Sequence, residues 1–153
     1  MQLTENFTLS EFLISQTASR LGIDNTPTQQ VVDNLRLLCE NILQPLRLAL
    51  GPVVVSSGYR SPLLNKAIGG AANSQHMLGQ AADIQIPGIG NDELARFIAS
   101  QFQFDQVILE FYTLGEPDSG WVHVSYNLEG NRRQELTAVK QGGKTVYLAG
   151  IIS

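Results

Sequence analysis

Apolar side chains recur at helical spacing across the first third of the chain. Successive members are separated by four, three, four and four residues, which places them on one face of a helix. They are Val31, Leu35, Leu38, Ile42 and Leu46. Thr26-Pro27-Thr28-Gln29 predicts that this helix begins at Pro27, Pro45 predicts a kink, and Gly51 predicts its end. A shorter helix is predicted in "SEFLIS", because Thr8 and Glu11 form a capping-box pattern.

Strand patterns dominate the rest of the chain. "PVVVSS" predicts a buried strand, "AADIQI", "DQVILEF" and "WVHVSY" predict three more, and "LTAVK" and "TVYLAG" predict a hairpin around "QGGK". Two helices are expected among them, one starting at Ser61-Pro62 and one capped by Asn91, with a loop over residues 69–80. This order predicts an α+β fold, with a small, mainly antiparallel sheet and helices packed on one face.

Length and composition restrict the class of protein. A chain of 153 residues without repeats or a linker predicts a single domain over residues 1–153. A net charge of -4 argues against a nucleic-acid partner, and no apolar run is long enough for a membrane span. The single cysteine, Cys39, excludes an intrachain disulfide and is expected to be buried.

The chain contains only two histidines, and strand alternation directs one of them away from the core. In "AADIQI" the isoleucines mark the core face and Asp83 points the other way, as His123 does in "WVHVSY". The loop before "AADIQI" contains Gly79 and can bring His76 over the same face. Two imidazoles and one carboxylate form the ligand set of a catalytic zinc, which keeps a fourth position for water. The alternative is that each histidine is a hydrogen-bonded structural residue.

Three separated segments resemble one known family. "SQHMLGQAADI" is similar to the Ser-x-His-x-x-Gly-x-Ala-x-Asp signature of the zinc D-alanyl-D-alanine carboxypeptidases and L-alanyl-D-glutamate endopeptidases, which cut the peptide part of bacterial cell walls. "GWVHVSY" resembles the second zinc-histidine strand of this family, and "SSGYRSP" resembles its arginine turn. The resemblance covers about residues 8–135 and implies the Hedgehog/DD-peptidase fold, with one zinc ion bound by His76, Asp83 and His123. "LSEFLISQTA" and "FDQVILEF" are similar to a small single-domain branch found in phages and prophages.

A zinc peptidase also needs a carboxylate that takes a proton from the attacking water and returns it to the leaving amine. Many members of the family carry this acid three residues before the last zinc histidine, where this chain has Gly120. Glu110, at the end of a predicted strand, and Asp118, in the following loop, are the two available replacements. We favour Glu110 as the general base because a strand end fixes a side chain better than a loop does.

Three further residues are candidates for contact with the substrate. Arg60 is expected to clamp a substrate carboxylate or to stabilise the oxyanion, the alternative being a structural arginine paired with an acid. Ser74 and Gln75 precede the first proposed ligand and are expected to bind substrate. The alternative for Ser74 is a hydroxyl that binds the backbone of its own loop.

The sequence therefore predicts an endolysin-like zinc peptidase that hydrolyses peptidoglycan stem peptides, acting as a carboxypeptidase or an endopeptidase. Its oligomeric state is left open. One alternative is a non-hydrolytic zinc-binding structural or assembly protein of a phage, which Gly120 favours, and another is a metal-free interaction module. The N-terminus lacks a secretory signal pattern, which predicts synthesis in the cytoplasm and action at the cell wall after release, or in a virion.

Overall fold

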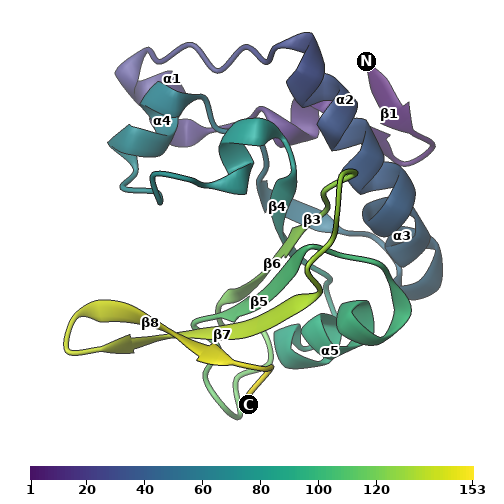
Figure 1. The fold of residues 1–153 in the computed structure, drawn as a ribbon, viewed down its shortest axis with the longest axis vertical. Coiled ribbons are helices and arrows are strands. Elements are labelled where there is room, and N and C mark those ends of the chain that lie inside the picture. The colour runs from purple at the N-terminus through teal and green to yellow at the C-terminus, as the bar shows by residue number, and fades with distance from the viewer.

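The computed structural model describes residues 1–153 and shows an α+β fold built on a six-stranded mixed sheet, which confirms the predicted class (Figure 1). The strands are β3 (Val54–Ser57), β4 (Ala81–Gln85), β5 (Gln106–Glu110), β6 (Trp121–Ser125), β7 (Gln134–Gln141) and β8 (Lys144–Ala149). They lie in the order β3-β4-β6-β5-β7-β8, and only the β5–β7 pair is parallel. A separate two-stranded sheet is formed by β1 (Gln2–Thr4) and β2 (Phe7–Thr8).

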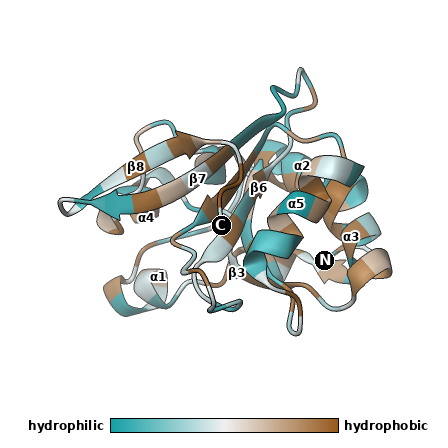
Figure 2. Ribbon diagram, turned by 90° about the horizontal axis from the view of Figure 1, so that it is seen from below, coloured by the Kyte–Doolittle hydropathy of each residue, from teal (hydrophilic) through white to brown (hydrophobic).

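Five α-helices accompany the six-stranded sheet. They are α1 (Gln16–Leu21), α2 (Gln29–Leu38), α3 (Gln44–Leu50), α4 (Pro62–Ala67) and α5 (Asn91–Gln101). Figure 1 shows α2, α3 and α5 along one side of the sheet, with the β7–β8 hairpin projecting away from them. Figure 2 shows hydrophilic residues on the outer turns of α5. The core lies between the sheet and helices α2, α3 and α5. No helix is both long enough and apolar enough to cross a membrane.

The predicted helical stripe is confirmed, since all five of its residues are buried in the core. The helix begins later than predicted, at Gln29, because the Thr28 hydroxyl accepts a hydrogen bond from the Val31 N–H. Before Pro45 the backbone widens into a π turn, η2 (Cys39–Leu43), in which the Gln44 N–H bonds to the carbonyl of Cys39. The proline thus interrupts the helix, and Gly51 ends α3 at a φ of 105°.

Other predictions for local structure need correction. The "PVVVSS" strand is not buried, because β3 is an edge strand and Val54 is 49% exposed. Asn91 is the first residue of α5 rather than its cap, and its side chain donates to the carbonyls of Ser119 and Gly120. The capping box at Thr8 is present, but it opens only a four-residue 3-10 helix, η1 (Leu9–Phe12). The predicted 69–80 loop contains a second such turn, η3 (Gln75–Leu78).

The central strands β4, β5 and β6 are buried on both faces. Their apolar alternates face the helices and belong to one core of 23 buried residues, among them Ala82, Ile84, Val107, Leu109, Val122 and Val124. The other alternates point away from the helices, into a cleft walled by η3 and by the β7–β8 hairpin. The polar residues that the sequence placed on this second face are therefore enclosed rather than exposed to bulk solvent.

Candidate metal centre

Asp83 and His123 lie opposite each other on neighbouring strands. β4 and β6 pair antiparallel in a register that matches these two residues, so their side chains leave the sheet on the same face. The Oδ1 atom of Asp83 is 3.2 Å from Nδ1 of His123, and both residues are buried. The structure thus brings together the two side chains that strand alternation placed on one face.

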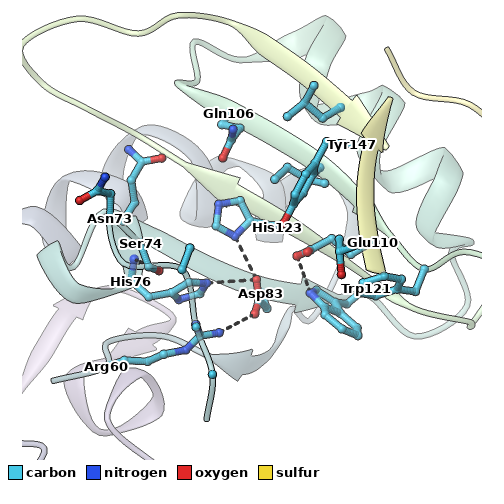
Figure 3. Close-up of a pocket in the computed structure, with 18 of the residues that line it drawn as sticks. Arg60, Asn73, Ser74, His76, Asp83, Gln106, Glu110, Trp121, His123 and Tyr147 are labelled. Atoms are coloured by element: carbon cyan, nitrogen blue, oxygen red, sulfur yellow. Dashed lines mark hydrogen bonds and ion pairs between the residues drawn. The ribbon is translucent and has the colours of Figure 1, made fainter. Parts of the chain in front are cut away.

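His76 reaches the same point from η3. The Ser74 hydroxyl accepts a hydrogen bond from the His76 N–H at the start of this turn, and Gly79 ends the turn at a φ of 72°. The His76 Nδ1 atom is 2.7 Å from the carbonyl oxygen of Gly58, and a carbonyl can only accept, so the ring proton is on Nδ1. Nε2 then carries a lone pair, and it lies 3.3 Å from Oδ1 of Asp83 (Figure 3).

These atoms fit a metal ion. The three potential ligand atoms of His76, Asp83 and His123 lie within 4.8 Å of one another, and Nε2 of His76 is buried without a hydrogen-bond partner. A buried acceptor that lacks a donor costs about 1–3 kcal/mol, and a cation bound between the lone pairs removes that cost. Imidazole nitrogen and carboxylate oxygen are ligands of Zn²⁺, and metal-binding histidines commonly donate their other N–H to a backbone carbonyl. The Gly58 carbonyl fills that second position here.

The Asp83 carboxyl is held in its ionised form. Burial raises the pKa of Asp83, but the hydrogen bond with His123 and the nearby His76 ring outweigh burial and keep that pKa well below its usual range. The second carboxylate oxygen, Oδ2, is 3.4 Å from Nη2 of Arg60. An ionised carboxylate is the form that binds a metal.

Arg60 is bound to the protein through all three guanidinium nitrogens. Besides Asp83, it contacts the Ser57 hydroxyl through Nε at 3.2 Å and the Asn65 side chain through Nη1 at 3.4 Å. Its backbone N–H donates to the carbonyl of His76, which ties the arginine turn to η3. These contacts favour the structural alternative considered for Arg60. The residue also lines the cleft, so its contact with substrate stays a prediction.

Glu110 lies on the same face as the ligand cluster, at the end of β5. The β5–β6 register places Glu110 opposite Trp121, and the indole N–H donates to Oε2 of Glu110 at 2.8 Å. Burial, and then the negative charge of Asp83, raise the pKa of Glu110, although the charge of His123 and the Trp121 hydrogen bond oppose them. A positioned carboxyl with a raised pKa suits the uptake and return of a proton.

Asp118, the other candidate base, lies elsewhere. Its backbone carbonyl is 3.3 Å from the side-chain nitrogen of Gln85, and the residue lines a separate hollow of about 270 Å³. Glu110 lines the cleft that contains the cluster, and Asp118 does not. The geometry therefore favours Glu110 over Asp118.

Ser74 and Gln75 are also bound within the protein. The Ser74 hydroxyl caps η3, which agrees with the alternative that it binds the backbone of its own loop. The Gln75 amide donates to Oδ2 of Asp105 at 2.9 Å. Arg132 binds the same buried carboxylate through Nε and Nη2, at 3.1 and 2.9 Å. Asp105 thus ties η3 to the start of β5. Its role was missed from the sequence, where the only signal is an acid directly before an apolar strand.

The cluster opens into a cleft of about 630 Å³. Figure 3 shows the labelled side chains of Asp83, His123 and Glu110 directed into this space from the sheet, with His76 entering from η3. The lining also includes Arg60, Ser74, Gln75 and Trp121, together with Lys140, Thr145 and Tyr147 of the hairpin. A cleft of this size can hold a short stretch of peptide beside the cluster.

A family model described as Peptidase M15 matches residues 5–125. The matched span covers most of the chain, including the three clustered residues and Glu110. The chain belongs to the peptidase M15 family. This membership confirms the family resemblance seen in the motifs and supports a zinc metallopeptidase, while the phage branch stays a prediction.

One relative of this M15 chain is the "Zinc D-Ala-D-Ala carboxypeptidase" of Streptomyces albus G. The two sequences are 50% identical over 44 residues. That segment is 28% of this chain and 17% of the relative, so the match spans about one sixth of the relative's length. It supports the family while leaving most of the relative without a counterpart here.

Gly120, where many M15 relatives are expected to carry the acid, has a structural reason to be glycine. It has a φ of 64°, and a Cβ atom placed there would be 1.9 Å from the carbonyl oxygen of Glu110 and under 3.0 Å from backbone atoms of Phe111. Phe111 itself has a positive φ of 56°. The ends of β5 and β6 approach too closely for any side chain at position 120.

Proposed function

We propose that this protein is a zinc-dependent peptidase that hydrolyses the stem peptides of peptidoglycan, with one zinc ion bound by His76, Asp83 and His123. The observation that carries the proposal is the arrangement around His76. Its Nε2 lone pair points at the ionised Asp83 carboxylate across 3.3 Å, in a buried place where no donor separates them. Two acceptors in that position indicate a site for a cation.

In the proposed mechanism, the zinc ion and Glu110 have different roles. His76, Asp83 and His123 would hold a zinc ion, which would polarise a peptide carbonyl and lower the pKa of a coordinated water towards about 7. Trp121 binds Oε2 of Glu110, which leaves Oε1 free to accept the proton of the attacking water. The water oxygen bonds to the carbonyl carbon, the C–N bond breaks, and Glu110 gives the proton to the departing amine nitrogen.

The substrate class rests on the family and on the cleft. The Streptomyces relative is named for action on D-Ala-D-Ala, and this chain is 50% identical to it over 44 residues. The cleft is open enough for a peptide and is lined by Arg60, Ser74 and Gln75, which we propose as substrate-contacting residues. Some donors and acceptors of these side chains make no hydrogen bond within the protein. These groups remain available to bind the peptide backbone or a terminal carboxylate.

The position of Glu110 favours an enzyme over a zinc-binding structural protein. A metal site used only for stability needs no acid beside it, and structural zinc sites usually fill all four positions with protein ligands. Here the cluster has three protein ligands, and a carboxyl with a raised pKa stands in the same cleft. These features support a catalytic site with a position kept for water.

The proposal is tested by incubating the zinc-loaded protein with purified peptidoglycan and identifying new amino and carboxyl termini by mass spectrometry. We expect cleavage within the stem peptide by the wild type and none by a Glu110→Gln variant that still contains zinc. The fragments also identify the bond, and thus distinguish a carboxypeptidase from an endopeptidase. Intact stem peptides after incubation with a fully zinc-loaded wild type would contradict the proposal and favour the structural alternative.

A further inference from the structure

The C-terminal hairpin forms part of the cleft although it lies beyond the residues that the family model matches. The match ends at residue 125, whereas β7 and β8 span residues 134–149. Four hairpin residues line the cleft, namely Leu136, Lys140, Thr145 and Tyr147. This wall of the site is therefore specific to the C-terminal segment of this chain rather than to the matched family region.

The strand register aligns Tyr147 with the proposed general base. Tyr147 pairs with Ala138, Ala138 pairs with Glu110, and Glu110 pairs with Trp121, so the four residues form one row on the cleft face. Neighbouring strands are about 4.8 Å apart, which separates the backbones of Tyr147 and Glu110 by roughly 10 Å. Ala138 between them is small and buried, which leaves room for the Tyr147 ring to lean across the row.

The Tyr147 hydroxyl is directed at the ligand cluster and is free to donate. Figure 3 shows the ring pointing down from the hairpin, with its oxygen between His123 and Glu110. The polar contacts around it use other groups, since Glu110 accepts from Trp121 and Lys140 donates to Thr145. Burial, and then the charge of Glu110, raise the pKa of Tyr147, so the hydroxyl keeps its proton.

Amide hydrolysis needs such a donor, because negative charge develops on the carbonyl oxygen during attack. Arg60 was the sequence-based candidate, but three of its five guanidinium N–H groups are used within the protein, whereas the Tyr147 hydroxyl makes no hydrogen bond there. We propose that the Tyr147 hydroxyl donates a hydrogen bond to the oxygen of the attacked peptide carbonyl and stabilises the charge that develops there. This role rests on the peptidase activity proposed above and makes Tyr147 a catalytic residue supplied by the hairpin.

The first test compares Tyr147→Phe with the wild type, using the zinc-loaded full chain and a stem-peptide substrate. Removal of one oxyanion donor lowers kcat by about 10²-fold or more, and we expect KM and zinc content to change little. The variant keeps the ring, and Tyr147 is 53% exposed, so the fold should tolerate the change. Tyr126→Phe is the matched control, because Tyr126 packs against the core rather than lining the cleft. An unchanged kcat for Tyr147→Phe would overturn the inference.

A second measurement does not depend on turnover. Trp121 is the only tryptophan of the chain and lines the cleft, so its fluorescence reports on occupancy. Phosphinate analogues of D-Ala-D-Ala and of L-Ala-D-Glu carry a tetrahedral anionic centre that mimics the charged oxygen. We expect Tyr147→Phe to weaken binding of the analogue that the wild type prefers by about 10²-fold, with no loss in Tyr126→Phe.

The two measurements separate the two proposals. Tyr147-dependent binding of an analogue by a wild type that hydrolyses no stem peptide would support the donor and reject the proposed function. Hydrolysis by the wild type with equal analogue affinity in Tyr147→Phe would reject the donor alone. A zinc-loaded wild type that neither hydrolyses a stem peptide nor binds either analogue would reject both.

Discussion

Replacement of Gly120 by alanine tests the reason why the general base is not at the family's usual position. The new Cβ would lie 1.9 Å from the Glu110 carbonyl oxygen, and the residue would keep a φ of 64°. A left-handed conformation costs a non-glycine residue about 1–2 kcal/mol. Backbone shifts forced by overpacking add about 1–3 kcal/mol. The free energy of unfolding should therefore fall by about 2–5 kcal/mol.

Gly22→Ala separates these two contributions. Gly22 has nearly the same φ, 66°, but no atom lies within 4 Å of a Cβ placed there. Urea unfolding of the zinc-free proteins should show a loss of about 1–2 kcal/mol for Gly22→Ala and a clearly larger loss for Gly120→Ala. Equal losses for the two variants would show that position 120 has room for a side chain, and the explanation for the displaced acid would be wrong.

Two further predictions concern the proton-transfer residues. Glu110→Gln should keep the zinc content of the wild type and lower kcat on a stem peptide by at least about 10²-fold. Asp118→Asn should leave kcat unchanged. The reverse pattern would assign the base to Asp118. Trp121→Phe removes a hydrogen bond that lowers the pKa of Glu110, so that pKa should rise. Because the base must be ionised, the acid limb of the kcat–pH profile should move to higher pH, and an unmoved limb would show that Trp121 does not act through Glu110.

Periodicity and alternation predicted much of the fold because they depend only on which residues face the core. The stripe from Val31 to Leu46 and the opposite faces of "AADIQI" and "WVHVSY" follow from this rule, and all reappear in the structure. The same rule placed Asp83 and His123 on the face away from the core, and the register of β4 and β6 brings them together there. The exposed β3 was misjudged because an apolar run does not reveal whether a strand lies at the centre or at the edge of a sheet.

The parts that could not be predicted depend on contacts between distant segments. The Gly58 carbonyl that fixes the His76 proton is 18 residues away in sequence, and the Asp105–Arg132 pair joins residues 27 apart. Tyr147 enters the cleft only because β7 pairs in parallel with β5 in a particular register. A parallel pair has no tight turn to set its register, so the sequence gives no local signal for it.

Metal stoichiometry tests the central claim, that His76, Asp83 and His123 bind zinc together. Proteins purified with added zinc and then dialysed can be analysed for metal and mass in the same sample. We predict one zinc ion per wild-type chain, loss of nearly all zinc in His76→Ala and in Asp83→Ala, and full retention in Asp118→Ala. A folded His76→Ala or Asp83→Ala variant that still holds one zinc ion per chain would contradict the account.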